Sequence, residues 1–349
     1  MKLGIIINSW NNEKTIIRAI NSIKKNKNTK IVVIDDASKD NSIKILKKKK
    51  IEKKIDILHI NKRNIGIAKS RNIGINLCKN TNYITFIDGD DYLNSSFVSF
   101  FFKKIKNSYE DLILFNFSYS LKEKIRKNNF FKLNKALDDK DIVDYFLKYL
   151  IKPNKNSLFT TCWSKLYKTR LLLKKKNQFN EKLHLCEDTD FVFRYLSIDK
   201  VKKVKYFNFS MYYHSLSDGK LNLKKSTFGI NIDLKNQISF LVALESCKKF
   251  LLKKFSNKSL LNKKLNHCIG AYTSIYMIRS CLRINSIKTF IEVYLFWKKI
   301  LRKEKINFAL KDYLPIKANG NIIFSYFLKK KFFFISIIIA YFIAKKRYL

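Results

Sequence analysis

The sequence predicts an α/β fold with a mostly parallel, Rossmann-like sheet and flanking helices, followed by a basic helical C-terminal region. Over the first third of the 349 residues, short apolar runs alternate with amphipathic segments. This alternation is typical of parallel strands joined by crossover helices. Each apolar run also ends in polar residues, and beyond residue 225 long lysine-rich segments with helical spacing replace the strands.

The predicted elements of the first third follow one another in a regular order. Strands are expected at 3–7, 30–36, 55–60 and 82–88, and helices at 12–25, 38–49 and 66–79. The first helix has isoleucines at helical spacing and lysines in its last turn. Ligands bind open parallel sheets beyond the carboxyl ends of the strands. The polar residues at those ends are therefore the first candidates for a site.

The rest of the chain is expected to extend the sheet and then become helical. Strands are predicted at 111–120 and 206–214, and helices at 138–151, 187–196, 238–255, 270–283 and 287–303, with Ser226 as a cap before the third of these. The last segment, 329–349, places an apolar run of about 13 residues between cationic clusters. Because a membrane span needs about 20 apolar residues, this run is too short to cross. It suits a helix lying in the cytoplasmic leaflet, or one buried in the core.

The chain is strongly basic, with a formal net charge of +45 and a pI near 10.0. Most of the excess is Lys, which favours diffuse attraction to anionic surfaces, although compositional drift explains part of it. A nucleic-acid partner is not expected, since no RNP-type aromatic block, zinc spacing or Arg-rich tract is present. The six cysteines are scattered, as in the reduced core of a cytoplasmic protein.

Three carboxylates lie together in "TFIDGDDYL", directly after the fourth predicted strand: Asp88, Asp90 and Asp91. Like charges this close repel one another, so a divalent cation or a donor-rich partner is expected between them. Asp-Gly-Asp is also ordinary turn chemistry. Neither GxGxxG nor the Walker GxxxxGK[ST] pattern occurs where it would mark a nucleotide site. A bound diphosphate would therefore be neutralised by a cation and by basic side chains.

Five blocks in order resemble inverting nucleotide-sugar glycosyltransferases of family 2, which have the GT-A fold. They are "IIINSWNNE", "IVVIDDASKDNS", "NIGIAKSRNIGI", "YITFIDGDDYL" with its DXD motif, and the pair "WSKLYKTRLL" and "CEDTDF". Together they cover roughly residues 1–215. The resemblance implies a GT-A catalytic domain at 1–225, with a nucleotide-sugar half at 1–98 and an acceptor half at 99–225. Residues 226–349 are expected to form a separate helical region that associates with membranes.

The first blocks imply a site for the donor nucleotide. Trp10 is placed to stack on a nucleobase, unless it is a core aromatic. Asp36 is placed to accept the imide N–H of uracil. Asn8 stands where many members have Pro, and Asn64 precedes Arg71 at the family's spacing.

Charged residues are expected around the donor's phosphates and ribose. Arg71 suits a pyrophosphate, or else lies on a solvated helix face. Asp88 is assigned to the ribose, Asp90 to the ribose, donor sugar or metal, and Asp91 to the metal, which is Mn²⁺ or Mg²⁺. His214 is assigned to the metal or the diphosphate, or else is structural.

On the acceptor side, Asp188 of "CEDTDF" matches the general base of similar enzymes. Its neighbours Glu187 and Asp190 are expected to stabilise the start of a helix. Trp163 is expected to pack beneath the acceptor. Ser38 and Asp40 are expected to cap the helix after the second strand.

The resemblance thus implies a hexosyltransferase that uses a nucleotide-sugar donor, most simply a UDP-sugar. Its acceptor would be a glycan or a lipid-linked acceptor in envelope polysaccharide or lipooligosaccharide synthesis. The enzyme would be cytoplasmic and peripheral on the anionic inner face of the cell membrane. The alternative is a non-catalytic basic protein that binds membrane surfaces or nucleic acid, which leaves the acidic cluster unexplained.

Overall fold

The computed structural model describes residues 1–105, 109–121, 124–127, 130–153, 157–215, 234–311, 313, 315 and 322–348. The chain divides into two compact units. Unit 1 comprises residues 1–138 and 158–219, and unit 2 comprises residues 139–157 and 220–349. The domain boundary expected after residue 225, and the predicted cap Ser226, lie outside the described residues.

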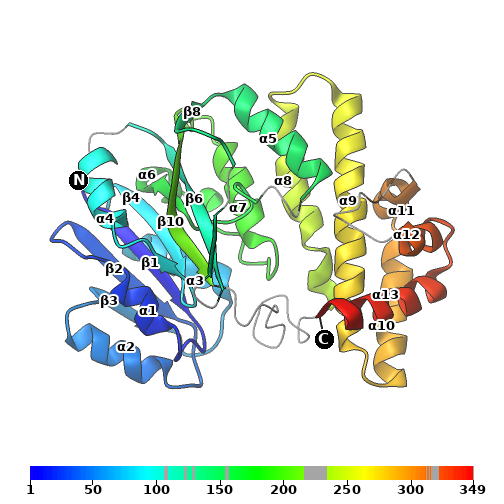
Figure 1. Ribbon diagram of the computed structural model, residues 1–349, viewed down its shortest axis with the longest axis horizontal. Coiled ribbons are helices and arrows are strands. Elements are labelled where there is room, and N and C mark those ends of the chain that lie inside the picture. Colours follow the sequence, from blue (N-terminus) through cyan, green and yellow to red (C-terminus); the bar gives the residue numbers. More distant parts are fainter. Residues whose placement is uncertain are drawn as a thin grey trace. The chain divides into compact units, whose positions relative to one another are not determined.

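Unit 1 is built on one mixed sheet, to which the described residues contribute ten strands in the order β3-β2-β1-β4-β9-β6-β10-β5, with β7 on β6 and β8 on β10 (Figure 1). The strands are β1 Leu3–Ser9, β2 Thr29–Asp35, β3 Ile57–Ile60, β4 Tyr83–Asp88, β5 Tyr92–Leu93, β6 Leu112–Leu121, β7 Lys124–Lys127, β8 Lys135–Leu137, β9 Lys165–Lys168 and β10 Val204–Ser215. The predicted α/β sheet is therefore confirmed.

The half of the sheet formed by β3, β2, β1 and β4 is parallel, as the continuous apolar runs predict. β1 lies between β2 and β4 and pairs with both in parallel register, with Ile5 opposite Ile31 on one side and Thr85 on the other. All seven residues of β1 are buried, because both faces of a parallel sheet are covered. β9 runs antiparallel to both β4 and β6, so β6 and β10 point the same way as β1. The carboxyl ends of β1, β2, β4 and β10 therefore lie along one edge.

The helical segments of unit 1 are α1 Ile16–Asn21, α2 Ser42–Ile51, α3 Ile67–Leu77, α4 Phe97–Phe100, η1 Phe101–Ile105, α6 Thr169–Leu172, η2 Lys175–Asn177 and α7 Glu187–Leu196. α3 packs closely on β1 at Gly74, where a Cβ atom would lie 2.5 Å from the Ile6 side chain. The sequence correctly predicts α2, α3 and α7, but α1 is much shorter than the expected helix at 12–25.

A short strand pair fixes the acidic turn against the end of β10. β5 pairs antiparallel with β10, with Tyr92 opposite Tyr213 and Leu93 opposite Tyr212. Asp91 precedes β5, so this pairing brings it beside the last residues of β10. The pairing was not predicted, because two-residue strands leave no periodic signal.

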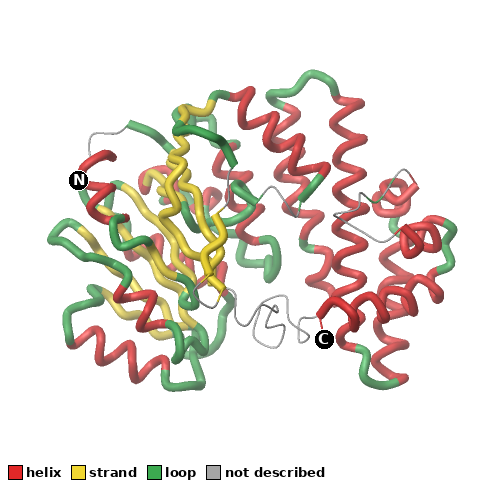
Figure 2. Tube along the Cα trace, viewed as in Figure 1, coloured by secondary structure: helices red, strands yellow, loops and turns green. Residues whose placement is uncertain are grey.

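The described secondary structure of unit 2 consists of helices alone (Figure 2). They are α5 Asp139–Ile151, η3 Leu234–Ile238, α8 Phe240–Leu252, α9 Lys258–Ser280, η4 Cys281–Arg283, α10 Ile287–Leu301, α11 Glu304–Lys311, α12 Ile322–Lys329 and α13 Phe333–Tyr348. α10 starts with a capping box between Ser286 and Thr289. It is anchored by the buried Trp297, whose indole N–H donates to Ser280 Oγ at 2.6 Å.

The C-terminal segment forms α13, which is buried on one side, as the alternative of a core helix predicts. One side of the helix is buried, at Ser336, Ile337, Ala340 and Ala344, and packs against α9, η4 and α10. The other side exposes Phe334 and Phe342. α13 is therefore a structural part of unit 2 that also presents an apolar face. In the described part of the chain, no helix is both long and apolar enough to cross a membrane.

Candidate active site

The candidate site lies at the edge of the sheet where β1, β2, β4 and β10 end. Asn8 is opposite Asp88 in the register of β1 and β4, and Asp36 directly follows β2. His214 is the second-last residue of β10. The parallel strand directions therefore bring together four predicted site residues from distant parts of the sequence.

The end of β1 carries polar groups and an aromatic side chain that are suited to a ligand. Both polar atoms of the buried Asn8 side chain lack a hydrogen-bond partner among the described residues. Orphaned groups of this kind are rare in folded proteins and indicate an absent partner. Trp10 is 51% exposed, which excludes its alternative assignment to the core. Gly89 lies next to this strand end, where a Cβ atom would be only 2.8 Å from the Asn8 carbonyl oxygen.

Asp36 organises the loop that precedes α3. Its carboxylate accepts hydrogen bonds from Asn61 Nδ2 at 2.8 Å and from the backbone amides of Ile65 and Gly66, both at 2.9 Å. This holds the exposed Asn64 at the edge of the site. A carboxylate oxygen has two lone pairs, so these three hydrogen bonds leave Asp36 able to accept the imide N–H of uracil. That contact stays a prediction.

Asp40 caps the start of α2 as predicted, because its Oδ1 accepts the backbone N–H of Ser42, the first residue of the helix, at 3.0 Å, whereas Ser38 has a different role. Ser38 Oγ accepts the backbone N–H of Asn11 at 2.8 Å, and Asp40 Oδ2 accepts that of Glu13 at 3.1 Å. Ser38 and Asp40 therefore join the turn after β1 to the turn after β2.

Arg71 joins the donor side to the predicted base. The guanidinium is 1% exposed on α3, and its Nη2 donates to Asp88 Oδ1 at 2.9 Å. Nη1 donates to Glu187 Oε1 at 3.1 Å and also to Asp188 Oδ1. Arg71 therefore does not lie on a solvated helix face, and both of its terminal nitrogens are engaged by protein carboxylates. This geometry favours a positioning role for Arg71 over the predicted contact with pyrophosphate.

The crowding of carboxylates around Arg71 changes their protonation. Burial raises the pKa of Glu187 to about 8, with repulsion from Asp188 adding to the effect and Arg71 opposing it. Burial also raises the pKa of Asp88, although attraction to Arg71 opposes the shift. Near neutral pH, Glu187 is therefore mostly protonated, which reduces the repulsion among the three carboxyl groups.

Asp188 is held from two directions at the start of α7. Besides Arg71, the backbone N–H of Cys162 donates to its Oδ2 at 3.1 Å. The Cys162 loop is held in turn by Lys165, whose buried ammonium donates to Thr161 Oγ1 and the Trp163 carbonyl, both at 3.1 Å. Burial lowers the pKa of Lys165 to about 7. Asp190, by contrast, accepts from Arg194 Nε at 2.8 Å and is structural, as predicted.

Asp90 and Asp91 occupy different environments. Asp91 is 0% exposed and accepts hydrogen bonds from Tyr212 Oη at 2.6 Å and the Ser215 amide at 2.7 Å. Its Oδ2 also lies 3.0 Å from His214 Nδ1. Asp90 is exposed at the turn. Its carboxyl is nevertheless crowded, and desolvation with repulsion from Asp91 and Asp88 raises its pKa to about 7.

His214 is oriented by Asp91 and by an aromatic stack. Burial alone would lower its pKa, but the Asp91 carboxylate outweighs this effect and raises the pKa to about 9. Its ring stacks on Trp163 with a centroid separation of 5.5 Å, and Tyr212 also stacks on Trp163, at 4.5 Å. Trp163 therefore packs beneath the end of β10.

Two contributors to this edge were missed by the sequence analysis. Tyr212 links Asp91 to the backbone N–H of Asp88, which donates to its hydroxyl at 3.3 Å. Arg18 Nη2 donates to the Asp90 carbonyl and to Ser215 Oγ, both at 2.7 Å. The only signal for Tyr212 was its position two residues before His214. Arg18 lies in a helix that otherwise gives an ordinary amphipathic pattern.

The donors present fit a metal that is shared with a ligand. Within the described ranges, no three His, Cys, Asp or Glu side chains form a group that could hold a metal ion by themselves. Mg²⁺ is typically bound by one or two carboxylates together with substrate phosphates and water. Asp90 and His214 are close enough for their charges to interact. A ligating His usually donates its other ring N–H to a carboxylate, as the His214–Asp91 contact allows.

The geometry defines a class of protein, a GT-A-type enzyme with an acidic turn at the carboxyl edge of its sheet. Residues 4–176 match the family model described as glycosyl transferase family 2. The fold resembles the crystal structure of S. aureus TarS 1-349 in complex with UDP-GlcNAc, with a TM-score of 0.63 and 17% identity over 99% of this chain and 91% of that chain. The chain belongs to glycosyltransferase family 2 and has the GT-A fold.

Two relatives illustrate the range within the family. "Glycosyltransferase GlyA" of Streptococcus pneumoniae is 30% identical over 235 residues, which is 63% of this chain and 31% of the relative. "Cholesterol galactosyltransferase" of Borreliella burgdorferi is 27% identical over 266 residues, 72% of each chain. The matched region spans only about a third of several relatives, including GlyA and a teichoic acid polymerase of Staphylococcus epidermidis.

We expect Arg71→Lys to lower the free energy of unfolding by roughly 3 kcal/mol, because removing one partner from a buried ion-pair cluster leaves charges uncompensated. A lysine ammonium cannot reproduce the fork that reaches Asp88, Glu187 and Asp188 together. Urea denaturation measures the change. The control, Arg63→Lys in the exposed loop before α3, should stay within about 0.5 kcal/mol of the parent. A fully stable Arg71→Lys would contradict the positioning role.

Glu187→Gln should become progressively more stable than the parent as the pH rises. The pKa of Glu187 is about 8 in the folded chain, above the usual value of an unfolded glutamate. The native state therefore favours the protonated form, and the parent loses stability as the pH rises from the unfolded pKa towards about 8. Glutamine cannot ionise and avoids this loss. Urea denaturation should show a difference on the order of 1 kcal/mol between about pH 6 and pH 8, and no pH dependence of the difference would refute the burial effect.

Proposed function

We propose that the protein is an inverting glycosyltransferase that moves a hexose from a UDP-sugar to a hydroxyl group of an envelope glycan or lipid-linked acceptor. The observation that carries this proposal is the Arg71 cluster, which holds Asp188 beside the donor-side Asp88. A nucleotide site and a candidate base are thereby joined at one sheet edge. A non-catalytic basic protein would have no need for this desolvated arrangement.

The proposed donor site uses the exposed and orphaned groups at the strand ends. Trp10 stacks on the base, Asp36 accepts from uracil, and Asn8 and Asn64 supply further polar contacts. The similar TarS structures were solved with UDP-GlcNAc and with UDP, which supports a UDP-sugar. Relatives named as galactosyl-, glucosyl- and N-acetylglucosaminyltransferases occur together, so the proposal extends to hexoses as a class.

The proposed chemistry is a single displacement. Asp188 removes the proton from the acceptor hydroxyl while that oxygen attacks the anomeric carbon and the bond to the UDP oxygen breaks. Arg71 and the Cys162 amide orient the Asp188 carboxylate, and each oxygen retains a lone pair for the acceptor proton. Only one base is required, which is why inversion is proposed.

A divalent cation, Mn²⁺ or Mg²⁺, would be held by Asp90 and His214 and would neutralise charge on the leaving diphosphate. The geometry revises the assignment of Asp91, whose buried oxygens accept three hydrogen bonds from the protein. We assign Asp91 to orienting His214 and the turn that carries Asp90.

The proposed setting is the cytoplasmic face of the cell membrane, with the enzyme bound peripherally and without a nucleic-acid partner. Several relatives are named for teichoic acid polymers, which supports an envelope glycan as acceptor. Envelope polysaccharide or lipooligosaccharide synthesis is the corresponding proposal for this chain.

The test of the base is Asp188→Asn, which keeps the size of the side chain but removes its proton acceptor. Transfer from a UDP-hexose should fall by roughly a hundredfold or more, since general-base catalysis contributes about 10² to 10⁴. UDP affinity should be retained. Single-turnover transfer measures the effect, with Glu187→Gln and Asp190→Asn as matched neighbours. Parental turnover in Asp188→Asn together with an inactive neighbour would move the base to that neighbour.

The metal assignment is tested by the Mn²⁺ dependence of UDP binding in calorimetry. Asp90→Asn should remove most of the Mn²⁺ dependence of UDP binding. Asp91→Asn should instead lower the affinity for Mn²⁺ about 10- to 100-fold, because His214 loses its orienting partner. Asp144→Asn, an exposed change on α5, is the control. If Asp91→Asn lost the Mn²⁺ dependence completely while Asp90→Asn kept the parental dependence, Asp91 would again be assigned as the direct metal ligand.

A further inference from the structure

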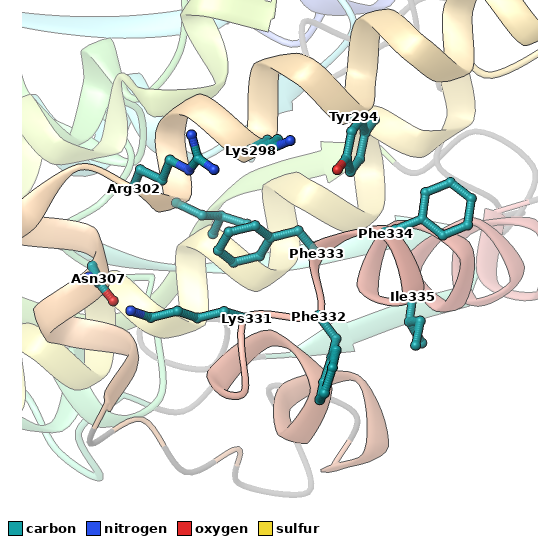
Figure 3. Close-up of a pocket in the computed structure, with 10 residues that line it drawn as sticks. Tyr294, Lys298, Arg302, Asn307, Lys331, Phe332, Phe333, Phe334 and Ile335 are labelled. Carbon is teal, nitrogen blue, oxygen red and sulfur yellow. The ribbon is translucent and has the colours of Figure 1, made fainter.

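A cationic groove lies in unit 2, between α10 and the turn that joins α12 to α13. It has a volume of about 580 Å³, and its lining residues include Lys298, Arg302 and Lys331 (Figure 3). Aromatic side chains line the groove between and beside these cations, including Tyr294, Phe333 and Phe334. Along the chain, the residues that line the groove are far from every residue assigned to catalysis. The proposed transfer reaction does not involve the groove.

The charge of the groove comes from its three cations, Lys298, Arg302 and Lys331. Among the described residues, none of Lys298, Arg302 and Lys331 forms a salt bridge, although Lys298 Nζ lies 5.4 Å from the centroid of the Tyr294 ring. Residues 287–349 contain 14 Lys or Arg and only 3 Asp or Glu. The groove therefore carries an uncompensated positive charge that suits an anionic partner.

The backbone at Lys331 adds a second observation. Lys331 has φ +64°, in the left-handed region that glycine or asparagine normally occupies at the end of a helix. A lysine there is disfavoured, and such outliers concentrate at functional sites. The turn places the Lys331 side chain on the same groove as Arg302 and Lys298 of α10 (Figure 3).

Large apolar side chains continue from the groove over the exposed surface. On α10, helical spacing puts Ile287, Ile291 and Leu295 on the same side as Lys298 and Arg302. Ile287 is 81% exposed and Leu295 is 55% exposed. The α12–α13 turn adds the exposed side chains of Phe332, Phe334 and Ile335. This set of α10 and turn residues is called the apolar rim below.

We propose that the groove and its apolar rim form a docking surface for an anionic phospholipid bilayer. The cations of the groove bind the phosphate of a lipid headgroup, and the apolar rim enters the boundary of the acyl layer. A soluble phosphate polymer would satisfy the cations but would leave the apolar rim exposed to water. The proposal rests on the membrane location put forward above and identifies the surface responsible for it.

The test uses the full-length chain and sedimentation with phosphatidylcholine vesicles, with or without about one third phosphatidylglycerol. The variant combines Lys298→Gln, Arg302→Gln and Lys331→Gln. Its matched control combines Lys299→Gln, Lys303→Gln and Lys330→Gln, which removes the same charge from exposed positions outside the groove. The groove variant should lose about 100-fold in affinity for anionic vesicles, and the control less than about 10-fold. Equal losses of affinity in the two variants would show that the attraction to anionic vesicles is diffuse, and would overturn the proposed role of the groove.

A second pair of variants tests the apolar rim. Ile291→Ser with Leu295→Ser should weaken vesicle binding about 10-fold or more. Val242→Ser with Leu260→Ser removes exposed apolar side chains elsewhere in unit 2 and should have little effect. If the charge variants fail to bind inorganic polyphosphate while the rim variants bind vesicles normally, the partner is a soluble polyanion and the membrane proposal is wrong.

The outcome is separable from that of the proposed function. Binding of UDP and transfer to a soluble acceptor should be unchanged in all four combined variants, because none alters a residue placed in the active site. Loss of vesicle binding with intact transfer supports the docking surface. Intact vesicle binding in the groove and rim variants refutes it, whatever the result for transfer. Chain truncation is unsuitable because α13 contributes buried side chains to unit 2.

Discussion

The candidate site depends on the burial of the Arg71 guanidinium among three carboxyl groups. Removing such a charge from water is costly, and it is tolerated only when hydrogen bonds and opposite charges replace the solvent. Asp88 supplies one partner from β4, while Glu187 and Asp188 supply two from α7. The arrangement fixes α3, β4 and α7 relative to one another within unit 1. The position of Asp188 beside the donor-side carboxylate follows from this constraint.

A second arrangement accommodates the remaining acidic residues at the same edge. Asp91 is compensated by the Tyr212 hydroxyl, His214 and a backbone amide, whereas Asp90 stays exposed at the turn. The closely spaced carboxylates thus divide into buried residues that hold the structure and one that faces solvent. Protein groups thus compensate Asp91, while Asp90 and His214 stay available for the ligand-shared cation proposed above.

Unit 2 combines a buried core with a surface that carries both apolar and cationic side chains. Its helices are anchored by residues such as Trp297 and by the buried side of α13, so its apolar content is only partly used for folding. Part of the exposed remainder, including Phe332, Phe334 and Ile335, lies with lysines and an arginine around one groove. An anionic bilayer interface offers a phosphate layer to the cationic side chains and an acyl layer to the apolar ones, whereas water suits only the cationic side chains.

The sequence by itself determined the elements with strong local patterns. The parallel strands, α2, α3, α7 and the acidic turn followed from apolar periodicity and polar strand ends, and the family followed from its five motif blocks. Only the tertiary structure decided which carboxylates meet Arg71, since Arg71 and Asp188 are separated by 117 positions and no local period links them. It also decided that Asp91 is buried and Asp90 exposed, because the two-residue strand β5 pairs with β10. Side-chain pairing across distant strands depends on packing and register, which the order of residues specifies only through the complete fold.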